Sequence, residues 1–182
     1  DRGICHAAKG HLSPYVWGIL SIFFLQVGQG DQPFLPKLAE FKMASGLMKK
    51  PQSTSTPRTW TAATNSDKTV GTLFKEFIHF YNKQFNWQTE AVSIRAGSRQ
   101  KPAVGLPLHI IVHENGTSTE VGPSIEDPFD DSKNLGTATH SASLQRLREE
   151  LARADELNTQ STSLETFLEP WAPPETPEQI SE

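Results

Sequence analysis

The sequence SPYVWGILSIFFLQV, residues 13–27, decides the fold. Its start is typical of a helix, because a serine side chain can cap the first turn and proline is well tolerated at the first helical position. Apolar side chains then cover nearly every face, and Gly28 and Gly30 end the helix. Such a helix is predicted to be surrounded by protein. The run Tyr15–Val27 is shorter than the roughly 20 residues that span a bilayer, so we predict a core helix.

The overall charge and the cysteine content limit the class of protein. The 182 residues carry a net charge of -4, which argues against binding nucleic acid through overall charge and leaves local basic patches open. The single cysteine, Cys5, excludes an internal disulfide framework and is typical of a reducing compartment. We expect an intracellular protein with no membrane partner, in either the cytoplasm or the mitochondrion. Because the chain begins at Asp1 without a leader, we expect a fragment of a longer protein.

Two further helices are expected. One is predicted to begin at a cap on Asp67 and to have Lys83 in its last turn, since apolar residues from Val70 to Tyr81 recur at i, i+3, i+4 and i+7. The other, at about residues 141–157, carries a narrow stripe of leucines. Glu149 and Arg153 are four residues apart on its outer face, where opposite charges are expected to pair.

A small sheet completes the expected fold. Residues 91–95 alternate like a short strand, and residues 108–113 form a second candidate. Asn115-Gly116 is a turn signal that pairs this second strand with one near residues 118–121. The fold class is therefore predicted to be mainly α with a small antiparallel sheet (α+β).

The composition divides the chain into a domain and a tail. Residues 1–157 are predicted to form the domain, with a mobile insertion at about 44–66, where Lys, Ser, Thr, Pro and Asn dominate. Residues 158–182 are acidic and rich in proline, and we expect them to be disordered. Three residues of this tail are candidates for docking onto the domain: Phe167, Leu168 and Trp171.

Several catalytic templates are not matched. Gly28-Gln29-Gly30 lacks the third glycine and the preceding strand of a dinucleotide fingerprint. The chain has no phosphate-binding loop and no Gly-x-Ser-x-Gly turn. Cys5, His6 and His11 lie close in sequence, but one thiol is a poor framework for zinc. We therefore predict no metal site.

The acidic loop, residues 125–136, is the strongest functional candidate. It begins Ile125-Glu126-Asp127-Pro128-Phe129-Asp130. Proline keeps Asp127 extended, and Phe129 is predicted to bury its ring and anchor the loop. Asp127 and Asp130 would then be fixed acceptors for amine or N–H donors. The alternative is a solvated acidic turn whose Asp130 or Ser132 caps a short helix, which composition alone favours.

The start of the first helix offers a second candidate. A helix N-terminus presents unpaired N–H groups and the positive end of the helix dipole, which suit phosphate. Tyr15 lies one residue further on, where its ring either stacks on a nucleobase or packs in the core. Together with the acidic loop, these groups would form a nucleotide pocket.

An ordered set of motifs resembles the terminal RNA nucleotidyltransferases, the poly(U) and poly(A) polymerases that tail RNA. The resemblance is to their poly(A)-polymerase-associated region and covers about residues 1–157. The motifs are Leu12-Ser13-Pro14-Tyr15, Pro33-Phe34-Leu35-Pro36, Val70-Gly71-Thr72-Leu73-Phe74, Phe85-Asn86-Trp87, Val92-Ser93-Ile94-Arg95, Ile125-Glu126-Asp127-Pro128-Phe129-Asp130 and Asn134-Leu135-Gly136.

The resemblance implies a site for the incoming nucleotide. Tyr15 would stack on the base, and Asp127 and Asp130 would organise the pocket. Pro14 replaces a serine whose hydroxyl assists the triphosphate in the family. Lys133 stands where members that prefer UTP commonly carry histidine, and lysine only donates hydrogen bonds. The predicted nucleotide-binding residues are Ser13, Tyr15, Asp127, Asp130 and Lys133.

The resemblance also implies what the chain lacks. Gly97-Ser98 is not followed by an Asp-x-Asp pair, so we predict no catalytic residue in this chain. The full-length parent is expected to use UTP or ATP with Mg²⁺ or Mn²⁺ and to add UMP or AMP to RNA 3′ ends. The alternative is a non-catalytic RNA- or protein-binding module derived from the same fold. The oligomeric state is not indicated.

Overall fold

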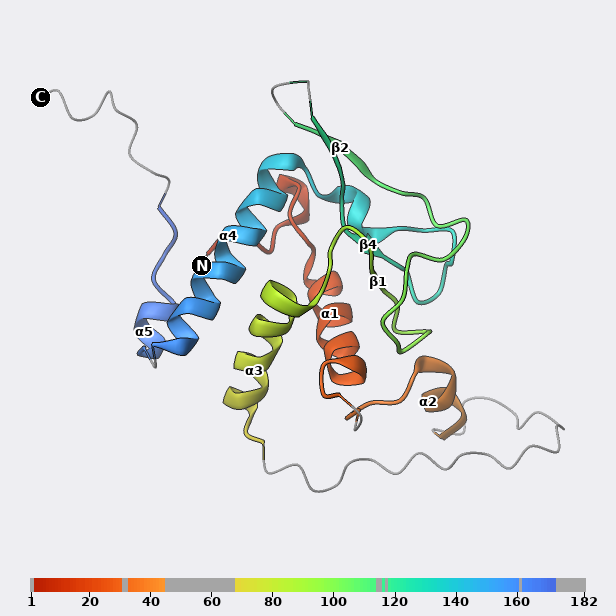
Figure 1. Ribbon diagram of the computed structural model, residues 1–182, viewed down its shortest axis with the longest axis horizontal. Coiled ribbons are helices and arrows are strands. Elements are labelled where there is room, and N and C mark those ends of the chain that lie inside the picture. The colour runs from red at the N-terminus through yellow and green to blue at the C-terminus, as the bar shows by residue number, and fades with distance from the viewer. Residues whose placement is uncertain are drawn as a thin grey trace, which may run out of the picture.

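The computed structural model describes residues 2–30, 33–44, 68–113, 116, 118–160 and 162–172. The predicted insertion at 44–66 lies outside these residues, except for Ala44, which ends a helix. In Figure 1, α1 runs between α3 and α4 on one side and the strands on the other. The helices and helical turns are η1 (Ala7–Lys9), α1 (Pro14–Val27), α2 (Leu38–Ala44), α3 (Val70–His79), η2 (Phe80–Gln84), η3 (Leu135–Ala138), α4 (Ser141–Thr159) and α5 (Leu164–Phe167).

Helix α1 begins where the sequence predicts. The Oγ atom of Ser13 accepts a hydrogen bond from the N–H group of Val16 at 3.2 Å. The prediction that protein surrounds the helix is wrong for the described part of the chain, because Tyr15 is 49% exposed and Ile22 is 38% exposed. An apolar composition shows that every face can be buried, but not that something covers each face. None of the described helices is long and apolar enough to cross a membrane.

Helix α3 begins later than predicted. Its cap is Thr69, whose Oγ1 atom accepts from the N–H group of Thr72 at 3.1 Å. The predicted cap, Asp67, lies outside the described residues. At its end α3 widens into η2, a turn of π-helix. This turn buries both Phe80 and Tyr81.

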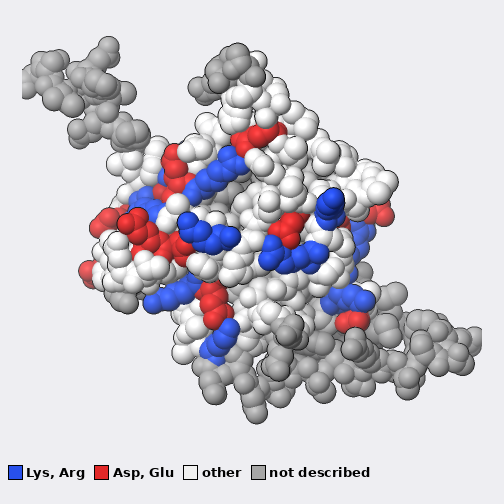
Figure 2. Space-filling model, viewed as in Figure 1, with Lys and Arg blue, Asp and Glu red and all other residues white. Residues whose placement is uncertain are grey.

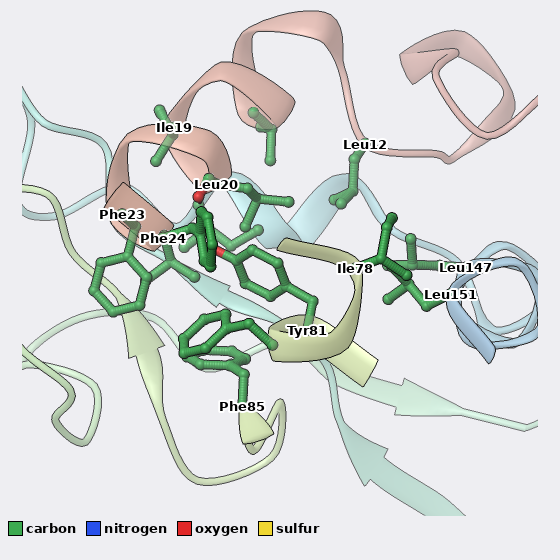
Figure 3. Close-up of a cluster of buried hydrophobic side chains, with 14 of the residues drawn as sticks. Leu12, Ile19, Leu20, Phe23, Phe24, Ile78, Tyr81, Phe85, Leu147 and Leu151 are labelled. Carbon is green, nitrogen blue, oxygen red and sulfur yellow. The ribbon is translucent and has the colours of Figure 1, made fainter. Parts of the chain in front are cut away.

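A cluster of aromatic rings joins α1 to α3 and η2. Figure 3 shows Tyr81 and Phe85 close to Phe23 and Phe24. Phe24 and Phe80 lie with ring centroids 5.7 Å apart, and Phe23 and Phe85 meet edge to face at 6.0 Å. Burial raises the pKa of Tyr81 well above its ordinary value, and its hydroxyl donates to the carbonyl of Leu20 at 2.8 Å. The aromatic cluster consists of Phe23, Phe24, Phe77, Phe80, Tyr81, Phe85 and Trp87.

Helix α4 packs against α3 and η2, and its predicted leucine stripe is buried. Figure 2 shows basic and acidic side chains intermingled on the side of the molecule where α4 lies. The predicted pair between Glu149 and Arg153 does not form in the described structure. Arg153 instead donates to the carbonyl of Thr166 at 2.6 Å, and Glu149 accepts from Gln145 at 2.9 Å. The segment that follows α4 offers Arg153 a carbonyl, which local sequence spacing does not reveal.

Part of the predicted tail is described and contacts the domain. Phe167, in α5, meets Phe74 of α3 with ring centroids 6.3 Å apart. The Arg146 guanidinium lies over the ring of Trp171 at 4.4 Å. Leu168 is exposed. The boundary at residue 157 stays a prediction.

Two pairs of short strands complete the fold. Strands β2 (Ile110–Val112) and β3 (Thr119–Val121) are antiparallel, as predicted, with Ile111 opposite Glu120. Strands β1 (Ala91–Val92) and β4 (Ser124–Ile125) form a parallel pair that the sequence did not predict. Strand β4 ends at Ile125, where the acidic loop begins. Because β4 pairs with β1, the loop starts next to β1, on the side of α1 where the strands lie (Figure 1).

Candidate functional site

Tyr15 is placed at the edge of the core by the first turn of α1. Pro14 has no N–H group, and Ser13 accepts from Val16 through its side chain and from Trp17 through its carbonyl. Within this described turn, the N–H group of Tyr15 is the one left to bind another acceptor. The Tyr15 side chain is half exposed, which excludes the core-aromatic alternative.

The acidic loop is held by Asn134 and not by Phe129. The Phe129 side chain is 78% exposed, so the predicted aromatic anchor is wrong. Asn134 is buried, and its Oδ1 atom accepts from the N–H groups of Ile125 and Gly136, both at 2.9 Å. Its Nδ2 atom donates to the carbonyl of Pro107 at 2.9 Å. One amide therefore closes the loop at both ends.

Glycine is required beside this amide. A Cβ atom on Gly136 would lie 1.9 Å from the carbonyl oxygen of Pro123. Glycine therefore allows the chain to pass close to the backbone of Pro123 after it has paired Asn134 with Glu126 in an isolated antiparallel bridge. The Asn-x-Gly spacing is thus a structural requirement of the acidic loop.

Asp127 and Lys133 contact each other across the acidic loop, through both their backbones and their side chains. The N–H group of Asp127 donates to the carbonyl of Lys133 at 3.1 Å, and the Nζ atom of Lys133 lies 3.7 Å from Oδ2 of Asp127. The Oδ1 atom accepts from the N–H group of Phe129 at 2.9 Å. The carboxylate is thus oriented from one side by the backbone and from the other by an ammonium group.

Asp130 shapes its own turn. Its Oδ1 atom accepts from the hydroxyl of Ser132 at 2.6 Å and from the N–H group of the same residue at 3.0 Å. These hydrogen bonds, with the nearby positive charges of Lys133 and Arg95, hold the pKa of Asp130 below its ordinary value. The carboxylate is fully exposed and stays ionised.

The structure places Tyr15 close enough to Asp127 for the two side chains to interact electrostatically. Partial desolvation raises the pKa of the Tyr15 hydroxyl, and the negative charge of Asp127 raises it further. The two residues are more than 100 positions apart in sequence. A half-exposed ring thus lies within electrostatic range of an oriented carboxylate.

Sequence reasoning missed an electrostatic contact at the start of the acidic loop, between Arg95 and Glu126. Arg95 reaches toward Oε2 of Glu126 at 3.9 Å and Oδ2 of Asp131 at 3.8 Å. Glu126 is only 4% exposed, and its Oε1 atom has no hydrogen-bond partner among the described residues. The available signal was the position of Arg95 at the end of the expected strand 91–95; no strand was expected before Glu126, which follows β4.

Residues 69–133 match the family model described as Cid1 family poly A polymerase. The predicted resemblance to the terminal RNA nucleotidyltransferases is confirmed. The match covers α3, η2, all four strands and most of the acidic loop. Tyr15 lies outside the matched residues.

Relatives and solved structures agree with this family. The chain is 29% identical over 143 residues to terminal uridylyltransferase 7 of Homo sapiens, which covers 71% of this chain and 8% of that protein. It is 26% identical over 168 residues to poly(A) RNA polymerase cid11 of Schizosaccharomyces pombe, covering 91% and 32%. A structure of Cid1, described as having RNA terminal uridylyl transferase activity, superposes with a TM-score of 0.68 and 20% identity, covering 96% of this chain and 54% of Cid1. The chain thus spans about half of the solved proteins it resembles and less of the two relatives.

The described residues do not fit a catalytic metal. No group of three or more His, Cys, Asp or Glu side chains gathers in the described part of the chain to hold an ion. Cys5 is exposed, and the sequence neighbours His6 and His11 join it in no such group.

Proposed function

We propose that this chain supplies nucleotide recognition in an RNA 3′-terminal nucleotidyltransferase that adds UMP or AMP. The observation that carries the proposal is the half-exposed Tyr15 ring within electrostatic range of the oriented carboxylate of Asp127. The match to the Cid1 family supports it, because the acidic loop falls largely inside the matched residues.

The base of the nucleotide would lie on the Tyr15 ring. Stacking of a base on an aromatic side chain stabilises binding by about 1–3 kcal/mol and does not depend on which base is stacked. The exposed ring offers a face to a ligand without any rearrangement of the core. Tyr15 therefore supplies affinity and not selectivity.

Asp127 and Lys133 would read the edge of the base. The carboxylate accepts from the exocyclic amine of adenine or the ring N–H of uracil, and the ammonium donates to a ring nitrogen or a carbonyl of the base. Because the two groups lie 3.7 Å apart, they present an acceptor beside a donor. Both UTP and ATP carry a matching edge.

The triphosphate would meet the start of α1. The N–H group of Tyr15 and the positive end of the helix dipole attract a phosphate oxygen. The hydroxyl of Ser13 contributes mainly by capping, since its oxygen already accepts from Val16. When Mg²⁺ is bound to the parent, it supplies charge stabilisation at the reacting phosphate. No step of that chemistry is assigned to the residues of this chain.

The test uses the full-length protein with Tyr15→Ala. Loss of stacking should raise the KM for the nucleotide about 10- to 100-fold and leave the affinity for RNA unchanged. Tyr15→Phe keeps the ring and is the matched control, with a KM close to that of the wild type. An unchanged KM for Tyr15→Ala would remove this residue from the pocket.

A second arm separates the two candidate roles of the parent. The 182-residue chain alone is expected to add no nucleotide to RNA, because the residues for metal chemistry are not found in its described part. A full-length protein that binds nucleotide but never extends RNA would favour the non-catalytic binding module. Extension by the isolated chain would contradict its assignment as the recognition part.

A further inference from the structure

A polar groove lies at the opposite end of α1 from Tyr15. Its volume is about 440 Å³, within the range of pockets that bind small ligands. Between Tyr15 and Gln29 the helix rises by about 20 Å, so the groove is separate from the candidate nucleotide site. The groove lies between the ends of α1 and α4 and the side of α3, and its lining residues include Gln29, Lys75, His79, Asp155 and Asn158.

The groove is lined by amide groups without partners. Both the Oδ1 and the Nδ2 atoms of Asn158 are buried and have no hydrogen-bond partner among the described residues. The Nε2 atom of Gln29 is in the same state, while its Oε1 atom accepts from Lys68 at 2.8 Å. Buried polar groups in folded proteins are nearly always paired. Three such atoms around one groove indicate a ligand that both donates and accepts.

The charges of the groove leave a cation facing it. Oδ1 of Asp155 contacts His79 at 3.1 Å and its Oδ2 accepts from Asn82 at 2.8 Å. Glu76 pairs with Lys68 at 2.8 Å. Lys75, on the exposed side of α3, makes no ion pair in the described part of the chain. The two carboxylates are therefore compensated, and Lys75 is available to an anionic ligand.

We propose that this groove binds one nucleotide of a single-stranded RNA. The amide of Asn158 would turn toward the groove and pair with a base edge that presents a donor next to an acceptor, as Asn and Gln do with adenine. Lys75 would contact the adjoining phosphate. This inference rests on the proposed function, because RNA is the substrate class of the proposed parent. It adds a contact for the strand about 20 Å from the incoming nucleotide.

The test measures RNA affinity in the full-length protein without any nucleoside triphosphate. The probes are a fluorescent adenosine 15-mer and an abasic strand of the same length, compared by fluorescence anisotropy. Asn158→Leu should weaken binding of the adenosine strand about 10-fold and leave binding of the abasic strand unchanged. Asn158→Asp keeps the size and removes the donor, and it should lose most of the same selectivity.

Lys75→Ala tests the phosphate contact, and Lys83→Ala is its matched control. Lys83 is also exposed and lies two helical turns further on in η2, and it is not one of the residues that line the groove. Lys75→Ala should weaken both strands and lower the slope of log affinity against log salt by about 1. Lys83→Ala changes the net charge equally and should leave that slope nearly unchanged.

Three results would overturn the proposal. One is equal binding of the adenosine and abasic strands by the wild type. Another is unchanged RNA affinity in Asn158→Leu together with a higher melting temperature, which would mean that the groove holds only water. A third is the same loss for Lys75→Ala and Lys83→Ala. Because Tyr15→Ala is read through the nucleotide KM, failure at the nucleotide site and failure at the groove are distinguishable.

Discussion

The aromatic cluster and the acidic loop achieve a fixed shape by opposite means. The aromatic cluster is held by rings packed edge to face, with a single buried hydroxyl satisfied by a carbonyl. The acidic loop leaves its one ring, Phe129, in solvent and is held by the three hydrogen bonds of Asn134. Packing leaves no polar edge for a ligand, whereas hydrogen bonds hold the largely buried carboxylate of Asp127 in a fixed orientation. The difference shows why the loop, and not the better-packed cluster, carries the candidate site.

The largest expected effect comes from the aromatic cluster. Phe23→Ala should lower the free energy of unfolding by about 3–5 kcal/mol, since a fully buried ring is lost and a cavity remains. Its neighbour Ile22 lies on the exposed face of α1, and Ile22→Ala should cost about 0.5 kcal/mol. Urea unfolding of the two variants measures the contrast. Similar losses for both would mean that the two faces of α1 are equally covered in solution.

The next effect comes from the acidic loop. Asn134→Ala leaves two buried N–H groups without an acceptor and should lower the free energy of unfolding by about 2–4 kcal/mol. It should also raise the nucleotide KM of the full-length protein. Asn86→Ala is the matched control, because Asn86 also accepts from two N–H groups but is exposed, where water replaces it. Equal losses in the two variants would show that burial does not decide the strength of these bonds.

The same substitution, tyrosine to phenylalanine, can be made in the aromatic cluster and at the candidate site. Tyr81→Phe removes the hydroxyl that donates to the carbonyl of Leu20 and should cost about 1 kcal/mol of stability. Tyr15→Phe removes a half-exposed hydroxyl and should leave stability unchanged. Thermal or urea unfolding resolves the difference. A larger loss of stability for Tyr15→Phe than for Tyr81→Phe would mean that the Tyr15 hydroxyl, and not the Tyr81 hydroxyl, stabilises the fold.

The smallest effect is electrostatic and depends on pH. Hydrogen bonds from Arg99, which also lies over the Phe80 ring, hold the pKa of Glu90 below its ordinary value of 4.5. Because the folded pKa is the lower one, the stabilisation is present above 4.5 and is lost as the pH falls through the folded pKa. Glu90→Gln should therefore cost less than about 1 kcal/mol at neutral pH, since the pair is partly exposed. The difference from wild type should vanish in acid, and a difference that persists there would assign the effect to packing.

Regular helices were the part of the fold that sequence patterns could predict. The periodic apolar residues of α3 and α4 and the nearly unbroken apolar run of α1 indicate where each helix lies in the sequence, because such residues must be buried whatever their partner. Strand β1 has only two residues and pairs in parallel with β4, so neither period nor turn chemistry points to its partner. Helix α2 was also missed, since a seven-residue helix has too few turns to show a stripe.

The candidate site, too, could be predicted from the sequence only in part. Tyr15, Asp127 and Lys133 were selected from residue type and order, and the structure places Lys133 against Asp127 and Tyr15 near that carboxylate. Their roles toward a nucleotide stay predictions. The anchor could not be predicted, because hydrophobicity alone does not show whether the core has room for Phe129. The bonds of Asn134 depend on backbone groups that only the finished fold brings within reach of one amide.

The parallel pairing of β1 with β4 has a consequence for the order of folding. The two strands are joined by 31 residues, positions 93–123, so a long segment must close before their short ladder forms. Closing a loop of this length costs entropy that two residue pairs barely offset, and such non-local contacts form slowly. The α1–α3–η2 helices, with their local contacts, are expected to assemble first. The acidic loop follows directly after this last-formed ladder, so the protein should form the candidate site late in folding and lose it early in unfolding.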